Sequence, residues 1–396
     1  MPRVAPFEAL VYDARVVGPL DRVTARPYDV TNDDLRAGYL AASPYNVSRI
    51  DLPDADGADP YADAAATLGA WVDAGALRRT GPIHVGVEMV APARAGGGCV
   101  RGVITAMTLE PWGGSVLPHE EVIGGAVEDR LRLLRATRTH LSAIYGTVPG
   151  PVPGLARALE GAGAPDVTVV DEDGVTHRAW WLDPDLPLDG WLAEQPLLIA
   201  DGHHRYTTAL AYREEREAQD GAGPWDRVLT FIVDASAQDL AVRPYHRVQR
   251  RGDPLAGGVP AANLDEALGA LSDDPPIVAS VRRGGDGLDI AVHHLEGRGP
   301  ASLAVHRGGL DDLAPGDALT FTPSQDDAVS AVTEGDAVAA YLLPPTTPQA
   351  ILDVVRAGGR LPRKSTFFWP KPRTGIALMP LEPAMQVTAP PAPPAS

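Results

Sequence analysis

The 396-residue chain has one cysteine, Cys99, and two lysines, Lys364 and Lys371. A single cysteine excludes an intrachain disulfide framework and a cysteine-rich metal cluster, as is usual in a reducing compartment. No apolar run approaches the roughly 18–20 residues that span a bilayer, and the first residues lack the charged-then-apolar order of a signal peptide. We therefore expect a cytoplasmic protein with no membrane partner.

Basic residues are also scarce, with 34 Lys and Arg against 52 Asp and Glu and a net charge of −18 at pH 7. A protein that binds the nucleic-acid backbone or an anionic membrane needs a broad positive surface. The composition argues against both partners, although it permits a local basic pocket. At this length, with 44% hydrophobic residues, the chain can form a large α/β body or two to three structural units.

The two lysines lie seven positions apart in the segment Arg-Lys-Ser-Thr-Phe-Phe-Trp-Pro-Lys, residues 363–371. The codon bias of a GC-rich genome would explain why arginine replaces lysine elsewhere, and coincidence would explain the remaining pair. An ammonium, however, is a compact point charge that a guanidinium cannot always replace. We interpret Lys364, Ser365 and Thr366 as phosphate ligands and Lys371 as a substrate ligand.

Hydrophobic periodicity predicts alternating strands and helices. Strands are expected at residues 7–12, 83–90, 100–109, 167–170, 175–182, 196–200, 228–233, 240–242 and 338–343. Helices are expected from about residue 31 and at 61–74, 128–138, 206–219, 264–271 and 348–356. This order predicts an α/β (α+β) fold with a mixed sheet. The repeated Ala-Pro-Pro of residues 383–396 predicts a disordered tail.

The most informative motif is Asp-Gly-His-His-Arg at residues 201–205, between a predicted strand and a predicted helix. Such a turn points backbone N–H groups and the positive helix end at one place, which suits an anion. Gly202 permits close approach, while His203, His204 and Arg205 add donors. Asp201 is placed to bind a metal ion or to orient a histidine. The alternative is an ordinary helix cap with solvated histidines.

Other catalytic signatures are missing from the sequence. The Lys-Ser-Thr of residues 364–366 resembles the end of a P-loop, but Arg363 stands where its second glycine belongs. No Gly-x-Gly-x-x-Gly follows a strand, His119-Glu120 does not continue to the second histidine of a zinc hydrolase, and no Gly-x-Ser-x-Gly is present.

The motif at residues 201–205 resembles the phosphate-binding motif of the ParB/sulfiredoxin superfamily, in the form carried by free serine kinases. Those kinases also carry a Pro-His-Glu segment before a helix, as residues 118–120 do here. The whole chain resembles domain-of-unknown-function family 1015, through these motifs and the segments at 25–30, 43–49, 244–247 and 363–371. It departs from many relatives after Pro-His-Glu, where a Thr and a Pro-Lys pair are missing, so the preferred substrate and nucleotide stay open.

The resemblance implies a ParB/sulfiredoxin-like catalytic core at residues 99–250, with α/β regions at 1–98 and 251–382. It implies an ATP- or ADP-dependent kinase that uses Mg²⁺ and phosphorylates free L-serine or a related hydroxylated metabolite. Glu120 would be the general base, Asp201 a catalytic metal or orienting ligand, and Gly202, His203, His204 and Arg205 would bind the phosphates.

Further candidates for substrate binding are Asn46, Arg49, His119, His246 and Arg247. An amide and a guanidinium suit an amino acid's carboxylate, and residues 245–247 follow a strand end, where ligands gather in α/β sheets. Two other functions remain open: a ParB-like nucleotide switch or DNA-associated protein, disfavoured by the charge, and a phosphate-ester hydrolase. Homo-oligomer formation is left open.

Overall fold

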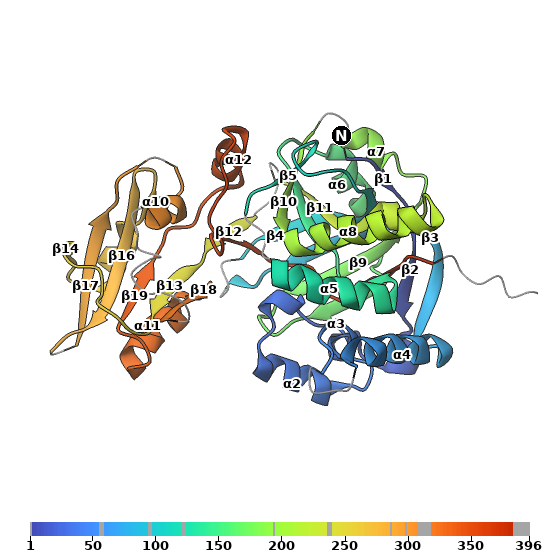
Figure 1. The fold of residues 1–396 in the computed structure, drawn as a ribbon, viewed down its shortest axis with the longest axis horizontal. Coiled ribbons are helices and arrows are strands. Elements are labelled where there is room, and N and C mark those ends of the chain that lie inside the picture. Colours follow the sequence, from blue (N-terminus) through green and yellow to red (C-terminus); the bar gives the residue numbers. More distant parts are fainter. Residues whose placement is uncertain are drawn as a thin grey trace, which may run out of the picture.

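The computed structural model describes residues 2–54, 59–93, 97–120, 124–192, 195–235, 240–285, 287–297, 299–307 and 318–382. Figure 1 shows a large lobe that contains most of the helices and a smaller lobe built on a second sheet. The disordered tail predicted for residues 383–396 lies outside the described residues.

Ten strands form the large sheet in the order β5-β10-β7-β11-β4-β3-β9-β8, with β1 paired to β4 and β2 to β3. The strands are β1 Val4–Ala5, β2 Phe7–Tyr12, β3 Leu77–Val90, β4 Cys99–Thr108, β5 Val116–Pro118, β7 Ile144–Val148, β8 Val167–Val170, β9 Thr176–Leu182, β10 Leu197–Asp201 and β11 Arg227–Asp234. β10 runs parallel to β5 and antiparallel to β7. The predicted α/β fold with a mixed sheet is therefore confirmed.

The two faces of this sheet bury separate hydrophobic clusters. The neighbours Phe231 and Ile232 on β11 belong to different clusters, because successive side chains of a strand point to opposite faces. Sheets that are covered on both faces carry nearly continuous apolar strands. This explains why short apolar runs, rather than alternating patterns, predict β10 and β11.

Helices α5 and α8 pack against each other over this sheet, and α4 packs against α5 (Figure 1). The helices of the large lobe are α1 Ala14–Val17, α2 Asp33–Ala42, α3 Ser48–Asp51, α4 Pro60–Asp73, α5 Gly124–Thr137, α6 Pro153–Glu160, α7 Leu188–Trp191 and α8 His203–Asp220, with short 3-10 turns at Leu20–Arg22, Tyr28–Val30 and Pro224–Asp226. Asn32 and Asp59 cap α2 and α4 by accepting hydrogen bonds from backbone N–H groups of the first turn.

The small lobe is a seven-stranded sheet in the order β14-β17-β16-β19-β13-β18, with β15 paired to β16. Its strands are β13 His246–Gln249, β14 Val259–Pro260, β15 Ser272–Asp273, β16 Pro276–Arg283, β17 Leu288–His294, β18 Leu319–Thr322 and β19 Ala339–Leu342. Its helices are α9 Leu264–Gly269, α10 Ala301–Arg307 and α11 Gln325–Glu334. None of the helices in the described ranges has both the length and the hydrophobicity that a membrane span requires.

After β19 the chain returns to the large lobe. It forms α12 Pro348–Arg356 and then β20 Thr366–Trp369, which pairs with β12 Ala241–Pro244 beside the small lobe. β21 Met379–Pro380 then pairs with β6 Thr139–His140 of the large lobe. The lysine-containing segment therefore lies at the junction of the lobes, far in sequence from the motifs that it approaches. The division at residues 98, 250 and 382 stays a prediction.

Candidate functional site

The turn between β10 and α8 has the conformation that its glycine permits. Gly202 caps α8 in the left-handed region, with φ 92° and ψ 30°, which side chains other than glycine rarely adopt. A Cβ at this position would lie 3.0 Å from both Arg205 Nε and Ile144 Cγ2. Because β5 runs parallel to β10, with Pro118 opposite Ile199, the Pro-His-Glu segment ends beside this turn.

The turn and that segment line a common cavity of about 110 Å³. Its lining residues are Tyr28, Asp29, Glu120, Ala200, Asp201, Gly202, His203, His204, Tyr245, Arg363, Lys364 and Thr366. The structure thus brings together three motifs that lie at least 80 residues apart in the sequence. We call this cavity the phosphate pocket.

Glu120 is held in the phosphate pocket by the segment that contains the lysines. The backbone N–H of Ser365 donates to Glu120 Oε1 at 3.3 Å, and the hydroxyl of Thr366 lies 3.2 Å from the same oxygen. Burial opposes ionisation, but the hydrogen bond and charge of His119, together with His203, lower the pKa of Glu120 to about 2. The carboxylate is therefore ionised at neutral pH and accepts hydrogen bonds.

His119 is fully buried behind Glu120 and does not line the pocket. Its Nδ1 donates to the carbonyl of Ile199 at 2.6 Å, and its Nε2 lies 2.7 Å from the Thr366 hydroxyl. That hydroxyl also contacts Glu120, so His119 and Glu120 share one hydroxyl between them. His119 therefore contacts Thr366 rather than the pocket, and the predicted contact of His119 with a substrate stays a prediction.

His203 lines the phosphate pocket as a neutral imidazole. The backbone N–H of His119 donates to His203 Nε2 at 3.2 Å, which leaves the ring proton on Nδ1. Burial and the positive charge of His119 lower the pKa of His203 to about 3. A neutral histidine can still donate a hydrogen bond from Nδ1. His204 next to it is half-buried and also lines the pocket, and burial lowers its pKa.

Asp201 is bound by two cations. Arg205 Nη2 lies 2.5 Å from Oδ2, and the Lys371 ammonium contacts Oδ1. The same ammonium lies 3.6 Å from Asp29 Oδ2. Burial alone would raise the pKa of Asp201, but the positive charges of Lys371 and Arg205 lower it. Burial alone would lower the pKa of Lys371, but the carboxylates of Asp201 and Asp29 raise it. Lys371 is thus a buried cation between two carboxylates.

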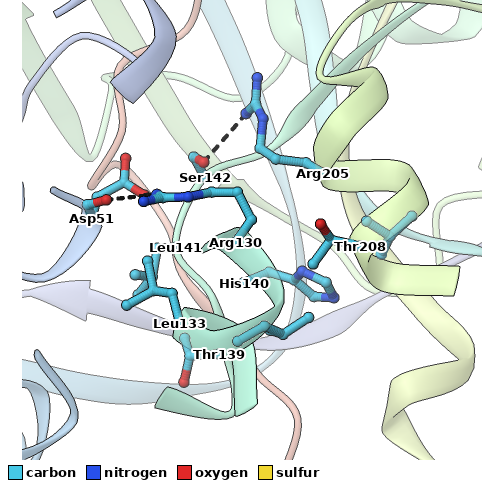
Figure 2. A pocket seen from close by; sticks show the side chains of 11 residues that line it. Asp51, Arg130, Leu133, Thr139, His140, Leu141, Ser142, Arg205 and Thr208 are labelled. Atoms are coloured by element: carbon cyan, nitrogen blue, oxygen red, sulfur yellow. Dashed lines mark hydrogen bonds and ion pairs between the residues drawn. The ribbon is translucent and has the colours of Figure 1, made fainter. Parts of the chain in front are cut away.

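Arg205 points away from the phosphate pocket. Figure 2 shows its guanidinium beside Ser142 in a small neighbouring cavity that Arg130 and Asp51 also line. It donates to Ser142 Oγ at 3.2 Å and to the carbonyl of Ala143. With its third contact on Asp201, it fixes the start of α8. Arg205 was predicted to bind a phosphate directly, but its side chain does not line the phosphate pocket.

Arg363 and Lys364 are the basic side chains that line the phosphate pocket within the described ranges. Lys364 has φ 54°, an unusual value for a residue other than glycine. Strained backbone of this kind clusters at ligand sites, where the surrounding structure holds it in place. Its ammonium lies 4.8 Å from the ring centre of Tyr245.

A divalent cation fits this site only together with phosphate oxygens. Asp29 and Asp201 line the pocket, but both oxygens of Asp201 already contact cations. In the part of the chain that the structure describes, no group of three or more His, Cys, Asp or Glu side chains is arranged to hold a metal. Mg²⁺ in nucleotide sites commonly uses one or two carboxylates with waters and phosphates, which Asp29 and Asp201 would provide.

Two of the candidate substrate ligands are used within the N-terminal fold. The side-chain amide of Asn46 is wholly buried and donates to the carbonyl of Arg22 at 2.9 Å. The guanidinium of Arg49 donates to the carbonyl of Leu40 at 2.6 Å. Neither residue lines the phosphate pocket, so both stabilise turns of the chain.

His246 and Arg247 lie at the start of the small sheet and also do not line the phosphate pocket. His246 Nδ1 accepts a hydrogen bond from the backbone N–H of Leu343 at 3.1 Å, and Arg247 is wholly buried and donates to the carbonyl of Tyr245 at 2.7 Å. The neighbouring residue Tyr245 lines the phosphate pocket, whereas His246 and Arg247, which were expected to bind the ligand, do not.

Sequence reasoning missed Tyr28, Asp29, Tyr245 and Arg363 as pocket residues. The available signals were the conspicuous Pro-Tyr-Asp turn at residues 27–29 and the position of Arg363 next to Lys364. Neither signal says which distant motif the residue approaches.

Solved structures with similar folds include a free serine kinase in complex with AMP, at 16% identity and a TM-score of 0.38, covering 64% of this chain and 83% of that one. A conserved hypothetical protein from Pyrococcus furiosus has 15% identity and a TM-score of 0.35, covering 64% and 87%. SbnI from Staphylococcus aureus with a C-terminal truncation has 11% identity and a TM-score of 0.36, covering 68% and 84%.

No curated protein matches the chain. A family model described as protein of unknown function (DUF1015) matches residues 4–354, which is most of the sequence. The match includes the Pro-His-Glu segment and the turn at residues 201–205. The chain therefore belongs to the DUF1015 family.

Proposed function

We propose that this protein is an ATP- or ADP-dependent kinase that phosphorylates the hydroxyl of a small metabolite, with free L-serine or a related hydroxy amino acid as the acceptor. The observation that carries the proposal is the convergence of an ionised carboxylate, a helix N-terminus and two basic side chains on one pocket. Phosphoryl transfer needs mainly positioning and neutralisation of charge, which these groups supply.

The transferred phosphoryl group would bind at the start of α8. The glycine turn leaves room for a close approach, and the N–H groups of the first helical turn carry partial positive charge. Lys364 and Arg363 would neutralise the phosphate oxygens from the opposite segment. Mg²⁺ bound with the nucleotide would add further neutralisation, held by Asp29 and Asp201.

Glu120 would accept the proton of the acceptor hydroxyl. Its low pKa keeps it ionised but makes it a weak base. A weak base is sufficient when the acceptor hydroxyl loses its proton late in the reaction, as in a loose phosphoryl-transfer transition state. Ser365 and Thr366 orient the carboxylate, and His119 orients Thr366. The neutral His203 can donate a hydrogen bond to a phosphate oxygen from Nδ1.

The test is an assay of the purified chain with ATP and, separately, ADP against a panel of hydroxy amino acids, with products identified by mass spectrometry. We expect Glu120→Gln to lower kcat by about 10²–10⁴-fold, the usual contribution of a general base. Glu215→Gln is the matched control, because Glu215 is an exposed carboxylate on α8 that pairs with Arg135.

The absence of any phosphorylated acceptor with either nucleotide would overturn the proposal, as would full turnover by Glu120→Gln. Phosphate released to water without an acceptor product would instead identify a hydrolase.

A further inference from the structure

A second and larger cavity, of about 620 Å³, adjoins the phosphate pocket. The two cavities share Asp29, Tyr245 and Lys364 as lining residues. The larger one is lined by residues of both lobes: Phe321 to Ser324 come from the small lobe, and Arg26 and Asp29 to Asn32 come from the large lobe. We call it the interlobe cleft. Cavities of roughly 300–1,000 Å³ are the size that holds drug-sized ligands, and a small amino acid would leave most of this one unfilled.

Flat groups from the lobe junction and from the small lobe line the cleft. The Arg243 guanidinium lies over the Trp369 ring, 3.8 Å from its centre. Pairing of β12 with β20 fixes this stack, with Arg243 opposite Phe367. Phe321 of β18 also lines the cleft; its side chain is 37% exposed, and the Arg247 guanidinium lies 5.4 Å from its ring centre. Guanidinium planes and aromatic rings are the surfaces on which nucleic-acid bases stack.

The charges of the cleft indicate which end of a ligand enters it. Arg26 is already paired with Asp173 at 2.7 Å. The lining also includes the carboxylate of Asp327, which would repel phosphate groups and can accept hydrogen bonds from sugar hydroxyls or an amino group. An uncharged, hydrogen-bonding ring system therefore suits the cleft, whereas anionic groups suit the phosphate pocket.

We propose that the interlobe cleft binds the nucleoside of the nucleotide, with its base between Phe321 and the Arg243–Trp369 stack and its phosphates directed past Lys364 into the phosphate pocket. This assignment rests on the proposed function. It gives the small lobe a role in catalysis, because Phe321 supplies one side of the nucleoside site. It also makes Lys364 the residue at which the two parts of the ligand meet.

The test is isothermal titration calorimetry of the full chain with ADP and with inorganic tripolyphosphate, which lacks the nucleoside. We expect Phe321→Ala to weaken ADP binding by about tenfold, as loss of a base-stacking partner does, and to leave tripolyphosphate binding unchanged. Lys364→Ala should weaken both. Val259→Ala is the control, because Val259 is an exposed apolar residue of the same lobe, 62% accessible, and lies outside the cleft.

If Phe321→Ala binds ADP as tightly as the unmodified chain does, or weakens both probes equally, the cleft does not hold the nucleoside. If the unmodified chain binds neither ADP nor ATP, the proposed function itself fails. Binding of ADP that is no tighter than binding of tripolyphosphate would overturn the cleft assignment alone.

Discussion

The two lysines have different surroundings, and their substitutions should separate stability from ligand binding. The Lys371 side chain is 7% exposed and lies between Asp201 and Asp29, whereas Lys364 faces both cavities. Removing one partner of a buried ion pair leaves an uncompensated charge, which is costly. An ordinary surface role would not explain why lysine persists at position 371.

We expect Lys371→Met to lower the free energy of unfolding by about 3 kcal/mol, at the low end for a broken buried pair because Arg205 still neutralises Asp201. Lys364→Met should lower it less, because Lys364 is only partly buried and the ammonium that lies between Asp201 and Asp29 is that of Lys371. The same substitution should weaken nucleotide binding. Denaturant unfolding of both variants measures the difference. Equal destabilisation by the two substitutions would contradict these separate roles.

At the scale of single elements, α8 has a left-handed glycine at its start and a glycine of positive φ at its end, which allows a matched comparison. Gly202 has φ 92° and Gly221 has φ 76°. A Cβ at Gly221 would meet no atom within 4 Å, but a Cβ at Gly202 would crowd Arg205 and Ile144. The turn before α8 is therefore constrained by packing as well as by backbone conformation.

We expect Gly221→Ala to cost about 1–3 kcal/mol of unfolding free energy, because φ 76° with ψ −160° is a backbone region that glycine almost alone adopts. Gly202→Ala should cost more and should also lower turnover, because the added methyl group displaces Arg205 from Asp201. Equilibrium unfolding and the kinase assay provide the two measurements. Unchanged turnover by Gly202→Ala would show that crowding of Arg205 at the turn is unimportant for the site.

Elements of this size were largely predictable from sequence because their signals are local. The predicted strand at residues 7–12 matches β2. The strands predicted at residues 83–90 and 100–109 correspond to β3 and β4, which pair antiparallel with Val90 opposite Cys99. Side-chain directions were not predictable in the same way. Arg205 turns back to Asp201, and His119 lies inside the protein while Glu120 lies in the pocket, because packing against distant segments decides where each side chain points.

At the scale of the whole molecule, the candidate site is completed by a segment that sequence patterns could not place. Residues 364–371 follow the small lobe in the chain and lie at the junction of the lobes, where β20 pairs with β12. Hydrophobic periodicity predicts each strand of this part of the chain, but it does not predict the strand with which each one pairs. The phosphate chemistry of the turn at residues 201–205 was therefore predictable, whereas the junction of two lobes at that turn was visible only in three dimensions.

Buried histidines are spread over both lobes, and they make stability depend on pH. Burial lowers the pKa of His84, His140 and His246 to about 4 and that of His203 to about 3. In the unfolded chain histidine titrates near 6.5. Between pH 6.5 and 4 the unfolded state therefore binds more protons than the folded state, so the free energy of unfolding falls on acidification.

Each such histidine contributes a slope of up to about 1.4 kcal/mol per pH unit in this window. Most carboxylates stay ionised down to about pH 5, so a denaturant series from pH 7 to pH 5 reports mainly on the histidines. We expect His140→Gln to make the slope shallower by up to that amount, because burial keeps this ring neutral in the folded chain, where its Nε2 lies 3.2 Å from the carbonyl oxygen of Arg227. His294→Gln, at an exposed position of β17, should leave the slope unchanged. If the two variants show the same slope, burial of His140 does not govern its protonation, and the acid sensitivity of the molecule must come from other groups.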